Sequence, residues 1–336
     1  MTPVTLGKTG ITVNRNGFGA LPIQRVSLEE AKKILRKAYD NGINFYDTAR
    51  GYTDSEMKLG ESLSDVRENI IIATKTPART VESFWNDLET SLRLLKTDYI
   101  DIYQFHNPSF CPKPGDGTGL YEAMLEAKAQ GKIRHIGITN HLLSVATEAV
   151  ESGLYETLQF PFSYLASEKD EALVKLCEEK NMGYICMKAL SGGLITHSDA
   201  AYAYLAQFPN TLPIWGIQKE SELDEFLSYN DNPPTLTEEM KELIAKDREE
   251  LAGDFCRGCG YCMPCPKGIQ INQCARMSQM IRRAPSEAWL SEYWQIEMAR
   301  TEECMHCGAC TKKCPYSLDT PTLLKKNYED YKTFLK

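Results

Sequence analysis

The chain has 336 residues, with 38 Lys and Arg against 46 Asp and Glu and a hydrophobic fraction of 42%. This composition excludes a wholly disordered protein, and the length suits one large domain plus a small one. The net charge of −8 argues against a nucleic-acid-binding protein that relies on backbone charge. No apolar stretch reaches the roughly 20 residues of a membrane span, and the first residues lack the apolar core of a signal peptide. We therefore expect no membrane span and a cytoplasmic location.

Short apolar, β-branched runs alternate with helical patterns over the first two thirds of the chain. The first helix is expected after Ser27, because Ser27 and Glu30 have the spacing of a capping box. Further helices are predicted over Val81–Lys96, Gly119–Gln130 and Glu168–Asn181. The predicted strands are Gly17–Ala20, Ile43–Tyr46, Ile70–Thr74, Tyr99–Phe105, Ile133–Ile138, Thr157–Phe160, Gly183–Met187 and Leu212–Ile217.

Eight strands that alternate with helices over this length predict an α/β fold of the (β/α)8 TIM-barrel class. A doubly wound open sheet is the alternative, and it normally carries a Gly-x-Gly-x-x-Gly turn after its first strand. Gly17-Phe18-Gly19 does not continue into that pattern. The barrel is therefore the favoured fold for residues 1–235.

Nine of the 12 cysteines fall near the C-terminus, and eight of these form two runs of four that each end in Cys-Pro. Three thiolates at two-residue spacing suit one [4Fe–4S] cluster, and the fourth cysteine of each run ligates the other cluster in two-cluster ferredoxins. We therefore expect two [4Fe–4S] clusters. The first would be held by Cys256, Cys259, Cys262 and Cys314, and the second by Cys304, Cys307, Cys310 and Cys265.

Two alternatives to this ligand assignment remain open. Cys-x2-Cys pairs also suit tetrahedral zinc. Cys274 could replace Cys265, because the first run has two residues before its last cysteine where a ferredoxin has three. With either ligand set, the pattern predicts a helical linker over 236–253, built on an amphipathic helix at Leu236–Leu251, and a small, mainly helical, ferredoxin-like domain over 254–336.

Four polar residues stand at or just after the ends of three consecutive predicted strands: Asp47, Tyr52, Lys75 and His106. The carboxyl ends of barrel strands form the face where active sites are built. A single lysine or histidine at such a place is more often a solvated or structural residue. Their occurrence together on one face predicts a catalytic group.

Two longer motifs surround these residues, namely 47–56 (DTARGYTDSE) and 131–140 (GKIRHIGITN). Together with 6–10 (LGKTG), they resemble the aldo-keto reductase superfamily, here as an iron–sulfur member. The resemblance implies that Asp47, Tyr52, Lys75 and His106 form the family's catalytic tetrad. Tyr52 would then be the general acid, with its pKa lowered by the Lys75 ammonium, while Asp47 balances Lys75 and His106 orients the carbonyl.

The same resemblance implies a nicotinamide cofactor, NADP(H) or NAD(H). Met187 stands where many relatives have a tyrosine that stacks on the nicotinamide. Near the end of the last strand, only Lys219 could pair a 2′-phosphate, and Glu220 and Glu222 would oppose one. The expected cofactor-binding residues are Gly19, Thr139, Asn140, Gln159, Met187, Leu190, Gly216, Gln218 and Lys219.

Three functional hypotheses follow. The first is an aldo-keto reductase that interconverts a small carbonyl and alcohol and is coupled to, or regulated by, two clusters. The second is a ferredoxin- or flavin-linked electron-transfer oxidoreductase, with FMN and a ferredoxin or other electron-transfer protein in place of nicotinamide. The third is a redox-sensing binding protein. The presence of all four residues of the catalytic tetrad argues against this third hypothesis.

Overall fold

The computed structural model describes residues 3–251, 255–283 and 287–335. The chain forms two compact units. The first comprises Met1–Ala189 and Tyr202–Leu236, and the second comprises Leu190–Ala201 and Thr237–Lys336. The segment Leu190–Ala201 thus belongs to the second unit, although the chain on both sides of it belongs to the first.

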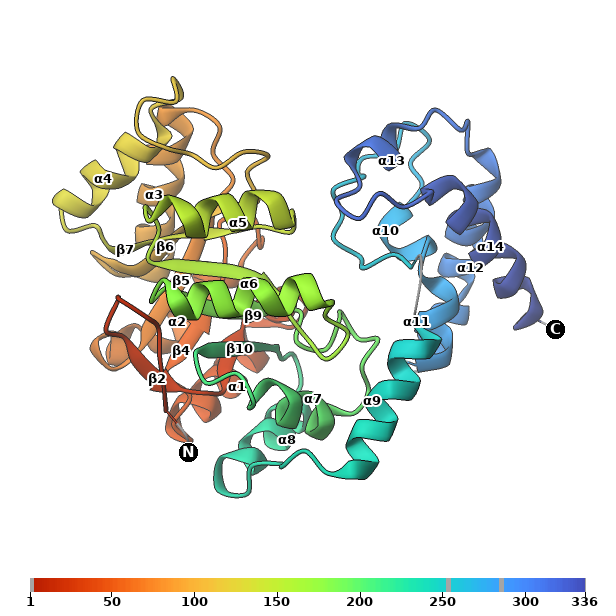
Figure 1. The fold of residues 1–336 in the computed structure, drawn as a ribbon, viewed down its shortest axis with the longest axis horizontal. Coiled ribbons are helices and arrows are strands. Elements are labelled where there is room, and N and C mark those ends of the chain that lie inside the picture. The colour runs from red at the N-terminus through yellow and green to blue at the C-terminus, as the bar shows by residue number, and fades with distance from the viewer. Residues whose placement is uncertain (1–2, 252–254, 284–286, 336) are drawn as a thin grey trace. The chain divides into compact units, whose positions relative to one another are not determined.

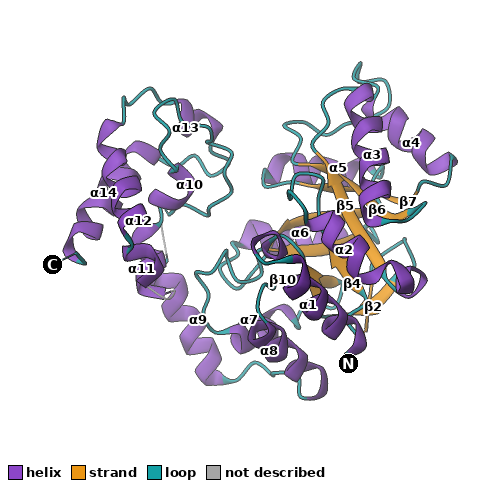
Figure 2. Cartoon of the chain, turned by 180° about the vertical axis from the view of Figure 1, so that it is seen from behind, coloured by secondary structure: helices purple, strands orange, loops and turns teal. Residues whose placement is uncertain are grey.

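The first unit is a closed barrel of eight parallel strands in chain order, with the last strand paired to the first (Figures 1 and 2). This confirms the predicted α/β TIM barrel. Several strands run one or two residues further than the sequence predicts, so Asp47, Lys75 and His106 lie within strands. The strands are β3 (Gly17–Gly19), β4 (Phe45–Asp47), β5 (Ile71–Thr76), β6 (Ile100–His106), β7 (Ile133–Thr139), β8 (Thr157–Pro161), β9 (Gly183–Met187) and β10 (Thr211–Gly216).

Helices surround the strands of the barrel (Figure 1). The first of them begins at the expected capping box, in which the Glu30 N–H donates to the Ser27 hydroxyl and the Glu30 carboxylate accepts from the Ser27 N–H. The longer helices are α1 (Leu28–Asp40), α2 (Ser55–Leu63), α3 (Val81–Leu95), α4 (Leu120–Ala129), α5 (Leu143–Ser152), α6 (Glu168–Glu179) and α8 (Glu220–Asp231). A further helix, α7 (Ser198–Leu205), begins within the segment Leu190–Ala201 and ends in the first unit. The 3₁₀ turns are η1 (Pro22–Arg25) and η2 (Ser64–Asn69).

A short antiparallel hairpin that the sequence analysis did not identify packs against the barrel core. It consists of β1 (Pro3–Thr5) and β2 (Thr12–Asn14). Its turn residue Gly7 has a φ of +50° and approaches the chain just before β9, where a Cβ would lie 2.4 Å from Asn181 O. The hairpin thus lies at the amino ends of the strands, and the carboxyl ends carry the candidate site.

The described part of the second unit contains helices and loops but no strand (Figure 2). Its helices pack around a core that includes Ile271, Met277, Met298, Leu324 and Tyr331. The helices are α9 (Glu238–Glu250), α10 (Ile271–Cys274), α11 (Met277–Arg283), α12 (Glu292–Ala299), α13 (Ala309–Lys313) and α14 (Thr320–Thr333), with η3 (Glu287–Leu290) and η4 (Arg300–Glu303). Among the described residues, no helix combines the length and apolar character that crossing a bilayer requires.

Candidate active site and cluster-binding loops

Strand register brings the predicted catalytic residues to one end of the barrel. Gly19 pairs with Asp47 between β3 and β4, and His106 pairs with Thr139 between β6 and β7. Lys75 lies on β5, between the strands of Asp47 and His106. Parallel strands share their carboxyl edge, so these residues meet at the face where barrel active sites form.

Asp47 and Lys75 form a buried ion pair. The Lys75 Nζ lies 2.7 and 2.8 Å from the two Asp47 carboxylate oxygens, and it also donates to Thr48 O at 2.6 Å. Burial raises the pKa of Asp47 and lowers that of Lys75, and the contact between the two groups opposes both shifts. Removal of either partner would leave an uncompensated charge in the barrel, which costs about 3–5 kcal/mol in comparable buried pairs.

Tyr52 and His106 lie together beside this pair. Their ring centroids are 5.8 Å apart in an edge-to-face arrangement, and the Lys75 Nζ is 5.2 Å from the centroid of the Tyr52 ring. Tyr52 is contributed by the loop between β4 and α2, and His106 is the last residue of β6. The structure therefore brings together all four residues that the sequence singled out.

The expected lowering of the Tyr52 pKa is wrong for this structure. Burial raises the pKa of the phenol above its ordinary value, and the negative charge of Asp47 adds to the shift. The Lys75 hydrogen bonds are directed to Asp47 and Thr48, and among the described residues none joins Lys75 to the Tyr52 hydroxyl. Tyr52 is therefore a protonated phenol at neutral pH, which is the form that can donate a proton.

His106 is held neutral. Burial lowers its pKa to about 3, and the positive charges of Lys75 and Arg79 act in the same direction. His141, two residues after β7, has its pKa lowered by burial and by Lys188 and His106. His141 was not among the residues predicted from the sequence, although its position just after a barrel strand is the signal that identified the other four.

Because His106 and His141 are held neutral in the folded state, we expect the free energy of unfolding to fall in acid. An unfolded histidine has a pKa near 6.5, so the unfolded chain binds more protons than the folded chain below that pH, and the free energy of unfolding falls on acidification. Each histidine should contribute a loss of about 1 kcal/mol between pH 6.5 and 5.5. Chemical denaturation at several pH values should show a smaller loss for His141→Gln. The control His197→Gln, at an exposed position, should match the wild type. Equal pH dependence in all three proteins would contradict this prediction.

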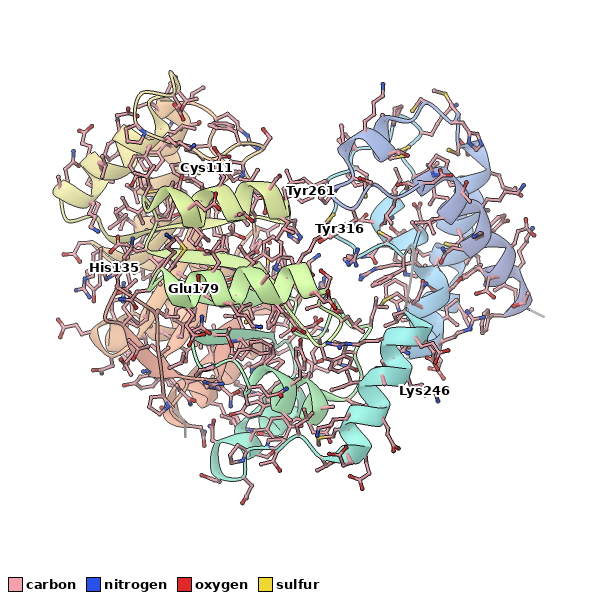
Figure 3. The ribbon with its side chains drawn as sticks, in the orientation of Figure 1. Cys111, His135, Glu179, Lys246, Tyr261 and Tyr316 are labelled. Atoms are coloured by element: carbon pink, nitrogen blue, oxygen red, sulfur yellow. The ribbon has the colours of Figure 1, made fainter. Side chains whose placement is uncertain are left out.

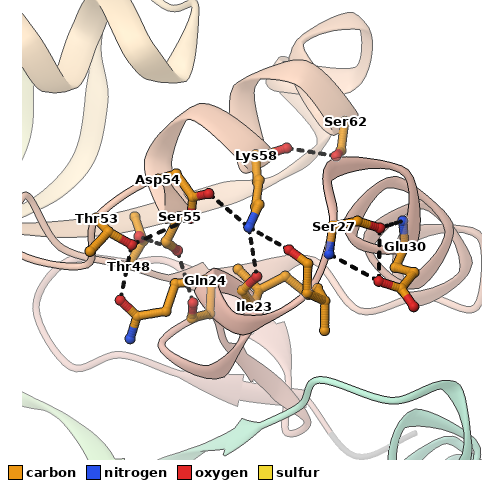
Figure 4. A network of polar contacts seen from close by, with 12 residues as sticks. Ile23, Gln24, Ser27, Glu30, Thr48, Thr53, Asp54, Ser55, Lys58 and Ser62 are labelled. Atoms are coloured by element: carbon orange, nitrogen blue, oxygen red, sulfur yellow. Dashed lines mark hydrogen bonds and ion pairs between the residues drawn. The ribbon is translucent and has the colours of Figure 1, made fainter.

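Polar contacts fix the loop that carries Tyr52 (Figure 4). Lys58 in α2 is buried, donates to Ile23 O at 3.1 Å and pairs with Asp54 at 2.9 Å. The Ser55 hydroxyl lies 2.8 Å from that of Thr48. The loop after β4 is thereby tied to the turn after β3.

A second set of contacts ties the same loop to β5. Glu56 in α2 is buried and accepts hydrogen bonds from the hydroxyls of Thr74 and Ser91, each at 2.7 Å. It also forms an ion pair with Arg50, whose backbone N–H donates to Lys75 O at 3.0 Å. Tyr52 is therefore held on a loop anchored at both ends.

Two of the predicted nicotinamide-binding residues, at the ends of β7 and β9, contact each other. The Thr139 hydroxyl lies 3.9 Å from the Met187 sulfur. Gln159 reaches across the barrel, with its Nε2 3.4 Å from Asp47 Oδ1, and accepts from Gln104 Nε2 at 2.8 Å. Gln104 is a further polar residue of the barrel interior that the sequence analysis did not identify.

Asn140, which follows β7, has partners for both ends of its amide. Its Nδ2 donates to Pro108 O at 2.8 Å, and its Oδ1 accepts from Leu142 N–H at 2.7 Å. The side chain is therefore fixed by the protein itself. Leu190, another predicted cofactor residue, is the first residue of the segment that belongs to the second unit.

The remaining predicted cofactor residues lie around β10 and the start of α8. Gly216 pairs with Gly19 between β10 and β3. The carboxylate of Glu222 accepts hydrogen bonds from the backbone N–H groups of Gln218 and Lys219, at 2.8 and 3.1 Å. Free N–H groups at a helix start are a common anion-binding site. Here the Glu222 carboxylate binds the two N–H groups that immediately precede the first turn of α8.

The second unit contains two cysteine-lined cavities. The lining of one includes Cys256, Cys259, Cys262 and Cys314. The lining of the other includes Cys265, Cys304, Cys307 and Cys310, together with Cys262. We call them the first and second cluster cavities. These sets match the two ligand sets assigned from spacing.

The chemistry of the two cavities fits a multi-atom cluster better than zinc. Four sulfurs at 2.3 Å from one tetrahedral zinc ion would lie about 3.8 Å apart. Among the described residues, no three His, Cys, Asp or Glu side chains are grouped closely enough to hold a single metal ion. The lining of both cavities is mostly apolar. Tyr316, which lines the first, is labelled in Figure 3.

Cys274 lines neither cavity. Its side chain is buried in the core of the second unit, with its sulfur 3.7 Å from Glu297 O, and burial raises its pKa to about 12. It therefore has the surroundings of a structural thiol. His306, between Cys304 and Cys307, is exposed and does not line the second cavity.

Comparisons with known proteins define the class of each part. The aldo/keto reductase family matches residues 15–200, and a 4Fe-4S dicluster domain matches residues 255–319. The family match covers more than half of the chain. This chain therefore belongs to the aldo/keto reductase family and carries a C-terminal 4Fe-4S dicluster domain.

Curated relatives resemble the barrel. L-galactose dehydrogenase of Arabidopsis thaliana is 32% identical, and the match covers 57% of this chain and 66% of that protein. Aldo-keto reductase YhdN of Bacillus subtilis is 30% identical, and the match covers 58% of this chain and 64% of that protein. The chain thus spans slightly less than two thirds of these two relatives. The NADH-specific methylglyoxal reductase of Escherichia coli is 28% identical over 58% of this chain and 69% of its own length.

Solved structures support the fold alone, since their identities are low. An aldo-keto reductase from Bacillus halodurans, AKR11C1 in its holo form, aligns with a TM-score of 0.64 at 22% identity and covers 74% of this chain and 96% of its own. An aldo/keto reductase from Klebsiella pneumoniae, in complex with NADP and acetate, aligns with a TM-score of 0.62 at 21% identity over 73% and 94%.

Proposed function

We propose that this chain is a nicotinamide-linked oxidoreductase that interconverts a small carbonyl compound and its alcohol, with Tyr52 as the general acid. The observation that carries the proposal is the buried Asp47–Lys75 pair beside Tyr52 and His106 at the carboxyl ends of the barrel strands. The two [4Fe–4S] clusters would exchange single electrons with an outside partner or regulate the barrel chemistry.

The proton chemistry follows from the states of Tyr52 and His106. Bound dihydronicotinamide supplies a hydride, which is the two-electron reductant that a carbonyl needs. The Tyr52 O–H donates its proton to the developing alkoxide oxygen, which is a stronger base than a phenolate, and solvent then reprotonates Tyr52. Neutral His106 donates an N–H hydrogen bond to the same oxygen and polarises the carbonyl.

Residues at the ends of β7 to β9 are suited to hold the nicotinamide. Thr139 and Gln159 offer polar groups for its carboxamide, and the Met187 thioether offers a soft apolar surface for its ring. All three belong to adjacent strands, and Gln159 is already oriented by Gln104 and Asp47. A side chain that is fixed before binding loses less entropy when the cofactor arrives.

The substrate class is proposed from the relatives. L-galactose dehydrogenase and NADH-specific methylglyoxal reductase are named for small polar carbonyl or alcohol compounds. The interior of this barrel mouth is polar, since Asp47, Lys75 and Gln159 are all buried there. We therefore propose a small oxygenated aldehyde, ketone or alcohol as the substrate.

We further propose that the cofactor is NADH and not NADPH. The Glu222 carboxylate is held by the N–H groups of Gln218 and Lys219, just before α8, and a 2′-phosphate bound there would meet its negative charge. Glu222→Gln should therefore strengthen NADPH binding by about fivefold and change NADH binding little, because a unit charge near a protein surface contributes on the order of 1 kcal/mol. Titration of both cofactors by protein fluorescence would measure this. The exposed Glu225→Gln on the same helix is the control, and an equal response to both cofactors would contradict the proposal.

A second candidate function is supported by the cluster cavities. Cys262 and Ile271 line both of them, so two clusters would lie close enough to pass single electrons. In this candidate function, a ferredoxin-type protein and bound FMN, and not nicotinamide, would supply the electrons for the reaction in the barrel. Anaerobically purified protein should then release a flavin on denaturation.

One assay distinguishes the two candidates. The anaerobically purified full chain is mixed with NADH and a set of small aldehydes and ketones, with methylglyoxal as the first probe. Under the main proposal, NADH consumption requires the carbonyl and nothing else. Turnover that appears only when a one-electron donor or acceptor is added would support the second candidate and contradict the first.

A further inference from the structure

The segment that continues the chain after β9 belongs to the second unit. Residues Leu190–Ala201 begin shortly after Met187, the last residue of β9. Leu194 and Ile195 in this segment are buried. The carboxyl ends of barrel strands carry the active site, so the covalent chain alone places the start of the segment at that end of the barrel. The order of this segment therefore bears on the proposed nicotinamide site at Met187.

The backbone from Lys188 to Gly193 has a conformation that needs support from other residues. Lys188 and Ser191 have φ angles of +57° and +50°, and Gly192 and Gly193 are also in the left-handed region. That region is unfavourable for residues that carry a Cβ, because the Cβ approaches the following carbonyl oxygen. Backbone of this kind persists where the surrounding structure fixes it. We therefore expect the conformation to be lost when those surroundings loosen.

Helix α11 contributes contacts that fix the segment. The Arg283 Nη1 donates to Leu194 O at 3.3 Å, and its Nη2 donates to Asp247 Oδ1 in α9 at 2.8 Å. The Arg283 side chain is only 13% exposed, so water competes little for these hydrogen bonds. Met280 lies beside Gly193, since a Cβ on that glycine would be 3.8 Å from the Met280 Cε. Asp247 thus fixes the guanidinium, which in turn holds the carbonyl of Leu194.

The same helix packs in a core that includes cysteines of both cluster cavities. Met277 and Ile281 of α11 are buried in the core of the second unit. That core also contains Cys256, which lines the first cavity, and Cys310, which lines the second. In small metal-binding domains, the free energy of binding the metal is free energy of folding. Loss of the clusters should therefore loosen α11 and, with it, the segment Leu190–Ala201.

We propose that loading of the clusters sets the affinity of the barrel for nicotinamide, because α11 holds the segment that continues β9, with Arg283 as a positioning residue. When both clusters are bound, the segment keeps the conformation that suits the cofactor. When they are absent, only a fraction of the molecules has this conformation, and the apparent affinity falls by that fraction. No electron transfer is needed for this effect. The inference rests on the proposed function, because it concerns the affinity for the proposed cofactor.

The test compares NADH binding by the full chain, purified without oxygen, before and after iron is removed with ferricyanide and a chelator. Removal should weaken NADH binding about tenfold, as expected if the segment is ordered in roughly a tenth of the cluster-free molecules. Reconstitution with iron and sulfide should restore the affinity. Equal affinity with and without clusters would overturn this inference and leave the proposed function standing. A loaded protein that does not bind NADH would overturn both.

Hydrogen exchange shows where the structure loosens. Residues 190–201 should exchange faster in the cluster-free protein than in the loaded one, whereas Ile133–Thr139 of β7 should keep their protection. Unchanged exchange of residues 190–201 would overturn the inference. Loss of protection in β7 as well would also overturn it, because the clusters would then stabilise the whole chain and not this segment.

Arg283→Lys tests the positioning residue while the clusters are in place. Lysine keeps the positive charge opposite Asp247 but lacks the second nitrogen that donates to Leu194 O. The variant should keep the iron and sulfide of the wild type and raise KM for NADH about threefold with little change in kcat, as expected for one lost hydrogen bond. Exchange of residues 190–201 should be faster. Other contacts of the segment remain, such as the hydrogen bond from Arg276 to Gly192 O.

Arg282→Lys is the matched control. Arg282 is the neighbouring residue of α11, but it is exposed and pairs with Asp330 of α14. The KM of this variant for NADH and its exchange of residues 190–201 should equal those of the wild type. An equal change in the two variants, or no change in Arg283→Lys, would overturn the role of Arg283.

Discussion

Replacement of Tyr52 by phenylalanine is expected to lower kcat/KM for carbonyl reduction by on the order of 10²–10⁴-fold, the usual contribution of a general acid. The substitution removes one hydroxyl and leaves the ring that packs edge to face on His106. It leaves the Asp47–Lys75 pair intact, so the barrel should remain folded. NADH affinity should be unchanged, because the proposed nicotinamide contacts are contributed by β7, β8 and β9.

The matched control for Tyr52→Phe is Tyr184→Phe. Tyr184 is buried on β9, and its hydroxyl has no hydrogen-bond partner among the described residues. Its removal should therefore leave turnover and stability close to wild type. Steady-state kinetics and NADH titration of the three proteins measure the effect. Wild-type turnover by Tyr52→Phe would refute the role of Tyr52 as the acid.

The double variant Cys304→Ser, Cys307→Ser is expected to lose about half of the iron and acid-labile sulfide of the protein. Both residues line the second cluster cavity, and neither lines the first. A cluster that keeps only Cys265 and Cys310 has lost half of its thiolate ligands, while the cluster of the first cavity keeps all four. Metal and sulfide analysis of anaerobically purified protein should therefore show one remaining cluster per chain.

Cys274→Ser is the control for this experiment. Cys274 lies outside both cavities, in the core of the second unit. The iron content of the Cys274→Ser protein should therefore equal that of the wild type. Loss of iron in Cys274→Ser would show that it is a ligand. Zinc in place of iron in the wild type would contradict the cluster assignment for both cavities.

The parts that could be predicted from sequence are those encoded by local patterns. β-branched runs such as Ile133–Ile138 identified the strands of the barrel, and the spacing of the two cysteine runs led to two ligand sets that reappear in the lining of the two cavities. The binding of iron by those thiols stays a prediction. The strands that carry Asp47 and His106 end one residue later than predicted, because polar side chains that end an apolar run can still point into a barrel.

The parts that could not be predicted depend on contacts between residues far apart in the chain. No local pattern indicates that Leu190–Ala201 belongs to the second unit or that Arg283 binds Leu194 O. The Tyr52 pKa was mispredicted for the same reason. The sequence suggested that the nearby Lys75 would lower this pKa. In the structure, burial and the negative charge of Asp47 raise it.

The most direct test of the proposed activity is to follow the hydride from NADH to the product. The full chain, purified without oxygen, is supplied with NADH deuterated at the transferred position and with methylglyoxal as the probe carbonyl. If the account is correct, the alcohol product carries one deuterium on the former carbonyl carbon, and Tyr52→Phe forms little of this product. An alcohol without deuterium, formed at the wild-type rate, would mean that electrons reach the substrate by another route and would contradict the account.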